Sequence, residues 1–154
     1  MGLGADGSKK IVDVVKQTPG TIGYLELSYA KESDMAVASI ENQDGEFIVP
    51  TPASASAAIN AFSQELANDV RTPIGDPPAF AKAAYPITGL TFILVRKDGT
   101  DAAAQQALKD FLSYAISTGQ DSAEEMSYAR LPNSVQKQGQ QLLSQLTAND
   151  QPLK

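Results

Sequence analysis

The sequence contains neither cysteine nor histidine among its 154 residues. Without these residue types the chain has no thiol nucleophile, no serine–histidine or cysteine–histidine dyad, no disulfide and none of the usual zinc ligand sets. Long apolar stretches are missing as well, because no run approaches the roughly 18 residues that a membrane-spanning helix needs. These absences exclude several common kinds of catalytic and metal site.

Positive charge is scarce, with 12 Lys and Arg against 18 Asp and Glu and a formal net charge of −6. This balance argues against a nucleic-acid partner, but a small anion needs only a few N–H groups aimed at it. Met1 leads into Gly2-Leu3-Gly4 with no charged or apolar leader region, so the sequence as given predicts no secretory signal. We expect either a cytoplasmic chain or a start placed inside a longer sequence.

A continuous apolar run, interrupted only by Thr91, covers residues 90–95. It is rich in β-forming residues and lies between Pro86 and the turn pair Asp98-Gly99, which is typical of a strand covered on both faces. A long helical pattern follows at once. The alternation of strands and helices predicts an α/β architecture.

Residues before this run predict two helices, a strand and a hairpin from their apolar spacing and turn residues. Gly23, inside the strand, indicates a close backbone approach. The predicted elements are a helix at residues 9–17 capped by Ser8, a strand at 21–27, a hairpin of 35–40 and 46–49 around Asn42-Gln43-Asp44-Gly45, and a helix through Ala55, Ala58, Ile59, Phe62 and Leu66.

Residues after the run predict three helices. Thr100 or Asp101 starts the first, and Gly119 is expected just past its end. Its expected buried stripe is Ala104, Leu108, Phe111, Leu112 and Ala115. A short helix is predicted at 122–127. The last helix has Pro132 in its first turn, an apolar face of Val135, Leu142, Leu143 and Leu146, and an interior Gly139 that costs about 1 kcal/mol relative to alanine. Residues 149–154 form a polar tail, expected to fray.

The spacing Gly2-x-Gly4-x-x-Gly7 formally matches a dinucleotide-binding fingerprint. That fingerprint requires a preceding strand, which is missing here, and an acidic residue after a second strand, whereas Glu26 lies inside a strand. A second interpretation is a helix start whose free N–H groups face an anion, with Gly4, Gly7 and Ser8 as the anion-facing loop. A third is a flexible turn that leads into a helix.

The remaining polar residues form no catalytic constellation. Serine and threonine without a histidine or a placed lysine base are interpreted as helix caps and solvated positions, namely Thr51, Ser54, Ser56 and Ser63. Glu124 and Glu125 point in different directions on a helix, so they are not a proton-sharing pair. We therefore expect no enzyme, no cofactor and no metal site.

Four blocks of the chain, in order and in register, resemble the phosphate-binding proteins of bacterial ABC transporters. The blocks are Gly2-Leu3-Gly4-Ala5-Asp6-Gly7-Ser8 with Val15-Lys16-Gln17-Thr18-Pro19-Gly20-Thr21-Ile22-Gly23-Tyr24-Leu25-Glu26, then Tyr85-Pro86-Ile87-Thr88 with Thr91-Phe92-Ile93-Leu94, then Phe111-Leu112-Ser113-Tyr114-Ala115 with Thr118-Gly119-Gln120, and Tyr128-Ala129-Arg130-Leu131-Pro132-Asn133-Ser134-Val135. Together they extend over nearly the whole chain.

The resemblance implies an α/β fold of the type II periplasmic-binding-protein kind, in which two lobes close on a ligand by a hinge motion. The chain looks like the C-terminal part, with portions of both lobes. Residues 1–85 are then the remainder of the second lobe. Residues 86–154 are the chain returning to the first lobe, as a strand plus packing helices.

The resemblance also implies a function: capture of inorganic phosphate for an ABC importer, in the periplasm or at the cell surface, with the transporter's membrane subunits as partners. The family's Arg…Ser-Gly-Thr phosphate-binding segment does not occur here, since Arg71-Thr72 and Arg130-Leu131 do not match it. We therefore carry over no phosphate-binding residue. The alternatives are a free-standing interaction or assembly domain that reuses the half-fold, and a nucleotide enzyme at residues 2–7.

A half-cleft has too few convergent donors to bind a desolvated phosphate well, so we expect weak or absent binding by this chain alone. Incomplete lobes also leave apolar surface and strand edges uncovered. We expect the chain to pair with the missing N-terminal half or to associate with itself.

Overall fold

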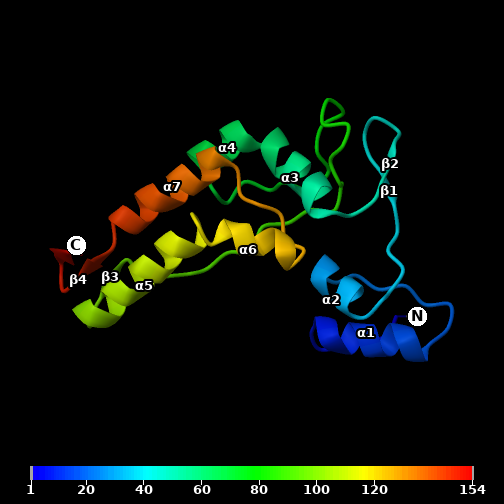
Figure 1. The fold of residues 1–154 in the computed structure, drawn as a ribbon, viewed down its shortest axis with the longest axis horizontal. Helices are drawn as coiled ribbons and strands as arrows, with labels where there is room; N and C mark the ends of the chain where they lie inside the picture. The colour runs from blue at the N-terminus through cyan, green and yellow to red at the C-terminus, as the bar shows by residue number, and fades with distance from the viewer. Residues whose placement is uncertain (1, 154) are drawn as a thin grey trace.

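The computed structural model describes residues 2–153 (Figure 1). Met1 and Lys154, which end the two expected lobe portions, lie outside the described residues. The elements in chain order are α1 (Ser8–Gln17), α2 (Leu27–Glu32), β1 (Ile40–Glu41), β2 (Phe47–Ile48), α3 (Pro52–Ala61), α4 (Ser63–Asn68), β3 (Asp98–Gly99), α5 (Ala102–Ala115), α6 (Gln120–Glu125), α7 (Asn133–Ser144), β4 (Thr147–Ala148) and β5 (Gln151–Pro152). At this level the fold is a mixture of helices and strands, as expected.

Two small sheets are present among the described residues. Strands β1 and β2 pair antiparallel around the predicted Asp-Gly turn, where the Asn42 side chain accepts from the N–H groups of Asp44 and Glu46, both at 3.0 Å. The hairpin prediction is confirmed, although residues 35–39 are not strand. Strand β3 pairs parallel with β4, and β4 pairs antiparallel with β5 at the C-terminal end.

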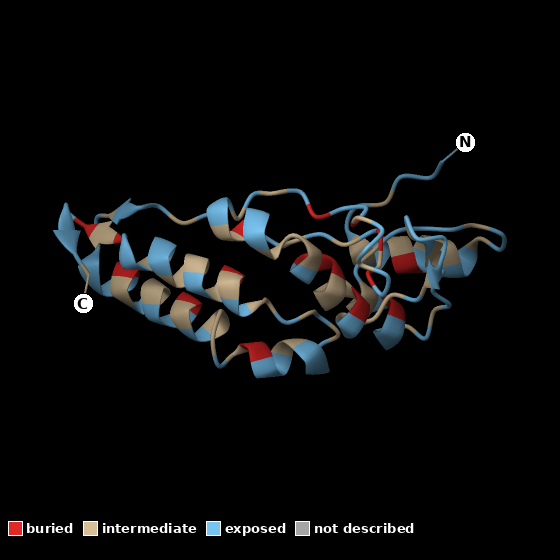
Figure 2. Cartoon of the chain, turned by 90° about the horizontal axis from the view of Figure 1, so that it is seen from above, coloured by how far each residue is buried: buried red, intermediate tan, exposed pale blue. Residues whose placement is uncertain are grey.

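The main core joins α3, α4 and α7. Its buried members are Ile59, Leu66, Ile74 and Val135. Figure 2 shows that buried residues are confined to short patches, with exposed stretches between them. The core draws on residues from both sides of Tyr85, while the division into lobe portions at that position stays a prediction.

The helix predictions are largely confirmed, but the single helix predicted through Ala55 and Leu66 is two helices, α3 and α4, separated at Phe62, and α2 was not predicted. Further corrections concern the helix ends. Asp101 caps α5 by accepting from the N–H groups of Ala103 and Ala104. Gly7, not Ser8, precedes α1, and its φ of 82° is in the region that favours glycine. Gly119 has φ −64° and starts α6 instead of closing α5 in a left-handed conformation.

Gly139 has a packing reason for its place inside α7. A Cβ atom there would lie 2.8 Å from the Cδ1 atom of Ile116, which follows α5. The glycine therefore allows α7 to approach the end of α5 closely. Pro132 precedes α7 as its N-cap residue instead of lying in the first turn.

Two predicted strands are not formed. Residues 21–26 and 90–96 belong to neither helix nor strand, and α2 begins at Leu27 inside the first of these predictions. The apolar character of residues 90–95 was correctly recognised, yet Leu94 is 96% exposed. A strand needs a neighbour to bond its N–H and C=O groups, and no other segment of the described chain supplies one to either stretch.

The predicted buried stripe of α5 is also only partly buried. Leu112 is buried, whereas Phe111 is 61% exposed and Ala104 is exposed. The helix packs against α7 and β4. Leu108 and Ala115 are half-buried, so only part of the stripe faces solvent.

Candidate functional site

The predicted anion-facing loop lies at the start of α1, where Gly7 accepts through its carbonyl from Lys10 and Ile11. Gly4 is exposed, and a Cβ atom added there would meet no other atom within 4 Å. The Ser8 hydroxyl donates a hydrogen bond to the carboxylate of Glu26. The structure thus brings Ser8 and Glu26 together across 18 residues, a pairing that the sequence analysis did not foresee.

This contact places a carboxylate beside the helix start. The hydrogen bond from Ser8 holds the pKa of Glu26 below its ordinary value. A negative charge beside the first turn of a helix is favourable, because the free N–H groups there carry partial positive charge. A bound phosphate would have to compete with Glu26 for the same region, and the anion-facing role of Gly4, Gly7 and Ser8 stays a prediction.

The same contact holds residues 21–26 against α1. Gly23 approaches the helix so closely that a Cβ atom would lie 2.8 Å from Ile11 Cγ2 and 3.0 Å from Val15 Cγ2. The close approach predicted at Gly23 is therefore confirmed. The segment is fixed along one side by α1 and open on the other.

The serine and threonine caps are confirmed at the start of α3. Ser54 donates its N–H to the Thr51 hydroxyl at 3.0 Å, and Thr51 donates its N–H to the Ser54 hydroxyl at 2.9 Å. The Ser54 hydroxyl also donates to the Val49 carbonyl. These hydrogen bonds engage both hydroxyls in capping the N-terminus of α3. Nearby Tyr85 is partly buried, and this burial raises the pKa of its phenol.

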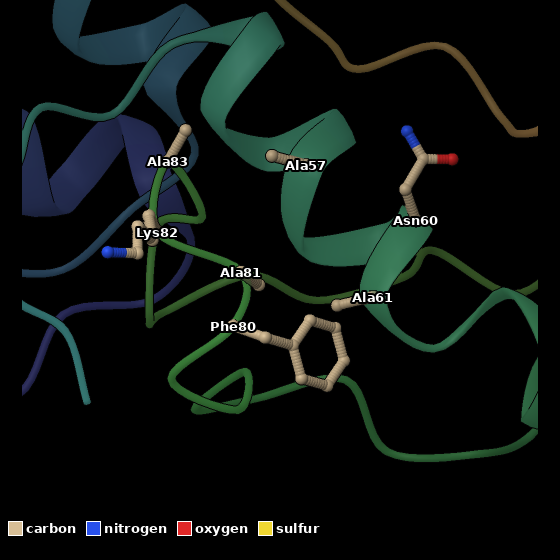
Figure 3. Close-up of a pocket in the computed structure, with 7 residues that line it drawn as sticks. All are labelled: Ala57, Asn60, Ala61, Phe80, Ala81, Lys82 and Ala83. Carbon is tan, nitrogen blue, oxygen red and sulfur yellow. The ribbon is translucent and has the colours of Figure 1, made fainter. Parts of the chain in front are cut away.

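A wide, open hollow of about 440 Å³ lies between α3 and residues 80–83 (Figure 3). Its lining consists of alanines with Asn60, Phe80 and Lys82. Figure 3 shows Asn60 and Lys82 pointing away from each other, and the Lys82 ammonium lies 3.3 Å from the Asp44 carboxylate. Convergent donors for an anion are therefore not assembled among these lining residues.

Both arginines singled out in the sequence are engaged in exposed ion pairs. Arg71 contacts Asp69 at 2.7 Å, and Arg130 contacts Asp121 at 2.6 Å. The Arg71 guanidinium lowers the pKa of Asp69 to about 2. Glu124 and Glu125 lie exposed on α6.

Two buried glutamines were missed by the sequence analysis. Gln105 donates to the Arg96 carbonyl at 2.8 Å, and Gln120 bonds both the Ala115 carbonyl and the Leu131 N–H. Gln105 precedes Leu108 and Leu112 on one face of α5, and this spacing was the available signal. Both amides connect loops to helices and are structural.

Within residues 2–153, no group of three or more acidic side chains is arranged to hold a metal ion. Of the helices in the same range, none combines the length and apolar character required to cross a bilayer.

Comparison with known proteins gives a consistent set of relatives, although no protein-family model matches the chain. The phosphate-binding protein PstS of Xylella fastidiosa (strain 9a5c) is 36% identical over 137 residues, and that of Methanocaldococcus jannaschii is 35% identical over 148. The Haemophilus influenzae protein of the same name is 30% identical over 134 residues. These matches cover 89%, 90% and 87% of this chain, but 37%, 38% and 40% of the relatives.

The chain therefore spans about two fifths of the length of these relatives. The resemblance indicated by the four sequence blocks is confirmed: over nearly nine tenths of its length, this chain is similar to a part of the phosphate-binding proteins PstS.

Proposed function

We propose that the chain is the C-terminal part of a phosphate-binding protein that captures inorganic phosphate for an ABC importer. The observation that carries this proposal is the similarity, over 89% of the chain, to relatives named phosphate-binding protein PstS. Those names describe binding proteins and not enzymes, and they give no support to a free-standing interaction domain.

The finer architecture belongs to the same proposal. The whole protein has the type II periplasmic-binding-protein fold, with residues 1–85 completing the second lobe and residues 86–154 returning to the first. It acts in the periplasm or at the cell surface and delivers phosphate to the membrane subunits of the transporter. Support for an incomplete lobe comes from the unpaired residues 90–95 and from the exposed apolar side of α5.

The phosphate-binding groups lie in the part of the protein that this chain does not contain. Tight phosphate binding requires several convergent donors in a closed cleft. In the described residues, the start of α1 is occupied by the Glu26 carboxylate, and Arg71 and Arg130 are paired with aspartates. This chain supplies the structural frame of the cleft and binds phosphate weakly by itself.

Isothermal titration calorimetry with inorganic phosphate tests the proposal. The samples are this chain alone and a single polypeptide in which the unmatched part of the Xylella fastidiosa protein precedes it. We expect saturable heat from the joined protein and little from the chain alone. A folded joined protein that gives no heat with phosphate would contradict the proposal.

A further inference from the structure

Three Asp-Gly pairs occur in the chain, namely Asp6-Gly7, Asp44-Gly45 and Asp98-Gly99. In such a pair the backbone nitrogen of glycine can attack the side-chain carboxyl carbon of aspartate, because glycine has no Cβ atom to block the approach. The reaction needs an N–H group and a carboxyl group that are both free to approach each other. Since the dipeptide is the same in all three places, the structure around each pair decides which of them reacts.

The Asp98-Gly99 pair is held at both of its reacting groups. The Asp98 carboxylate accepts from the Thr147 hydroxyl at 2.7 Å and from the Asp150 N–H at 3.0 Å. These hydrogen bonds hold the pKa of Asp98 below its ordinary value, which reduces the protonated fraction that reacts. Gly99 lies in β3, paired with β4, and a Cβ atom there would lie 2.7 Å from Gln105 Oε1. This pair has neither a free carboxyl group nor room to rearrange.

The Asp44-Gly45 pair is held within the hairpin turn. The Gly45 N–H, which would be the attacking group, donates to the Asn42 carbonyl at 3.0 Å. The Asp44 carboxylate lies 3.3 Å from the Lys82 ammonium, and its side chain is 30% exposed. Attack would have to open the turn and move the carboxylate away from its ion-pair partner.

The Asp6-Gly7 pair is held by neither kind of contact, in the stretch that precedes α1 (Figure 1). The Asp6 side chain is 97% exposed, and its ion-pair partner, the Lys10 ammonium, is 3.9 Å away. An exposed ion pair fixes a side chain weakly. Among residues 2–153, no acceptor bonds the Gly7 N–H. A Cβ atom at Gly7 would meet no other atom within 4 Å, so packing does not restrict the pair.

We propose that Asp6-Gly7 is the site at which this chain forms isoaspartate. The Gly7 nitrogen bonds to the Asp6 Cγ atom, and the hydroxyl of the carboxylic acid leaves as water with the amide proton, which gives a five-membered cyclic imide. Water then opens the ring. Addition at Cγ restores aspartate, whereas addition at the main-chain carbonyl carbon leaves Gly7 joined through the side chain of Asp6. The steps consume no reagent except water.

The product differs from aspartate in geometry and keeps its charge. The main chain between the Asp6 Cα atom and the Gly7 nitrogen gains one methylene, and the carboxylate moves onto the Cα atom. The change lies directly before α1, where the Gly7 carbonyl accepts from the N–H groups of Lys10 and Ile11. The modification therefore alters the chain path that leads into this helix.

The test is prolonged incubation of the folded chain at neutral pH, followed by tryptic digestion and location of isoaspartate by electron-transfer fragmentation. We expect isoaspartate at Asp6 to accumulate about tenfold faster than at Asp44 or Asp98, because hydrogen bonds that must open first lower the reactive fraction by roughly this factor. In concentrated guanidinium chloride the three rates should become similar, since the contacts that distinguish the pairs are lost.

Asp6→Glu is the matched variant, because it keeps the negative charge before α1 while glutamate would have to close a larger and less favourable ring. Methyl transfer from S-adenosylmethionine by a protein isoaspartyl methyltransferase counts the isoaspartate formed. This methyl uptake should fall to near background in aged Asp6→Glu, and the control Asp44→Glu should leave it unchanged.

Equal rates at the three positions of the folded chain would overturn the proposal, as would unchanged methyl uptake in Asp6→Glu. A tenfold preference for Asp6 that persists in the denaturant would also overturn it, because the local sequence and not the fold would then select the site.

Discussion

The region built from α3, α4 and α7 differs sharply from residues 22–25 and 91–95, although both are rich in apolar residues. In the first, Leu66 is completely buried and Ile59 is 3% exposed. In the second, Leu94 and Ile22 are almost completely exposed. The difference lies in what each element requires. A helix satisfies most of its own backbone and needs a partner only for one face, whereas a strand needs a partner for its backbone as well.

The largest expected contrast comes from the same substitution in the two regions. Leu66→Ala should lower the free energy of unfolding by about 2–5 kcal/mol, because it leaves a cavity in the core. Leu94→Ala should change it by less than about 0.5 kcal/mol, since the side chain is in solvent. Urea unfolding of both variants measures the difference. Equal losses would show that Leu94 is buried in solution and would remove the distinction between the regions.

A smaller effect is expected at the cap of α5, and it sharpens the boundary between the regions. Asp101→Ala should cost about 1 kcal/mol, because it removes an acceptor for the first free N–H groups of α5. Asp101→Asn keeps an acceptor and serves as the control. If α5 belongs to the cooperative unit, urea unfolding followed by circular dichroism will show the loss at a single transition. A separate, earlier transition would show that α5 unfolds independently of the core formed by α3, α4 and α7.

The smallest effect concerns the link between α1 and residues 21–26. Ser8→Ala removes the hydrogen bond to Glu26, so the pKa of Glu26 should rise toward its ordinary value. Because the folded pKa lies below the unfolded one, this contact stabilises the fold above the unfolded pKa, and the contribution is lost as pH falls through the folded pKa. NMR titration of Glu26 measures the change, with Ser56→Ala as the control. An unchanged titration would show that the contact is not populated in solution.

Local patterns predicted the helices and the hairpin well. The Asp101 cap, the turn around Asn42 and the apolar spacing of α3 and α4 all depend on residues close in sequence. The strand predicted at residues 90–95 is not formed, because strand pairing depends on residues far apart in sequence. Its residue types are suited to a buried strand, but no other segment among residues 2–153 pairs with it. The pattern identified a requirement for a partner and did not identify where the partner was.

The candidate site was less predictable than the fold. The capping roles of Thr51 and Ser54 followed from their places before a helix. The pairing of Ser8 with Glu26 did not, because it depends on how residues 21–26 lie along α1. Glu26 had been considered only as the acidic residue of a dinucleotide fingerprint. Contacts between segments far apart in sequence require the packing to be known first.

Amide hydrogen exchange across residues 91–95 tests most directly the claim that this chain is an incomplete part of a larger sheet. The samples are the chain alone and the polypeptide joined to the unmatched part of the Xylella fastidiosa protein. We expect amides at 91–95 to exchange at nearly unprotected rates in the chain alone, and at least a hundredfold more slowly when joined, while α7 stays protected in both. Strong protection of residues 91–95 in the monomeric chain, or none in the joined protein, would contradict the account.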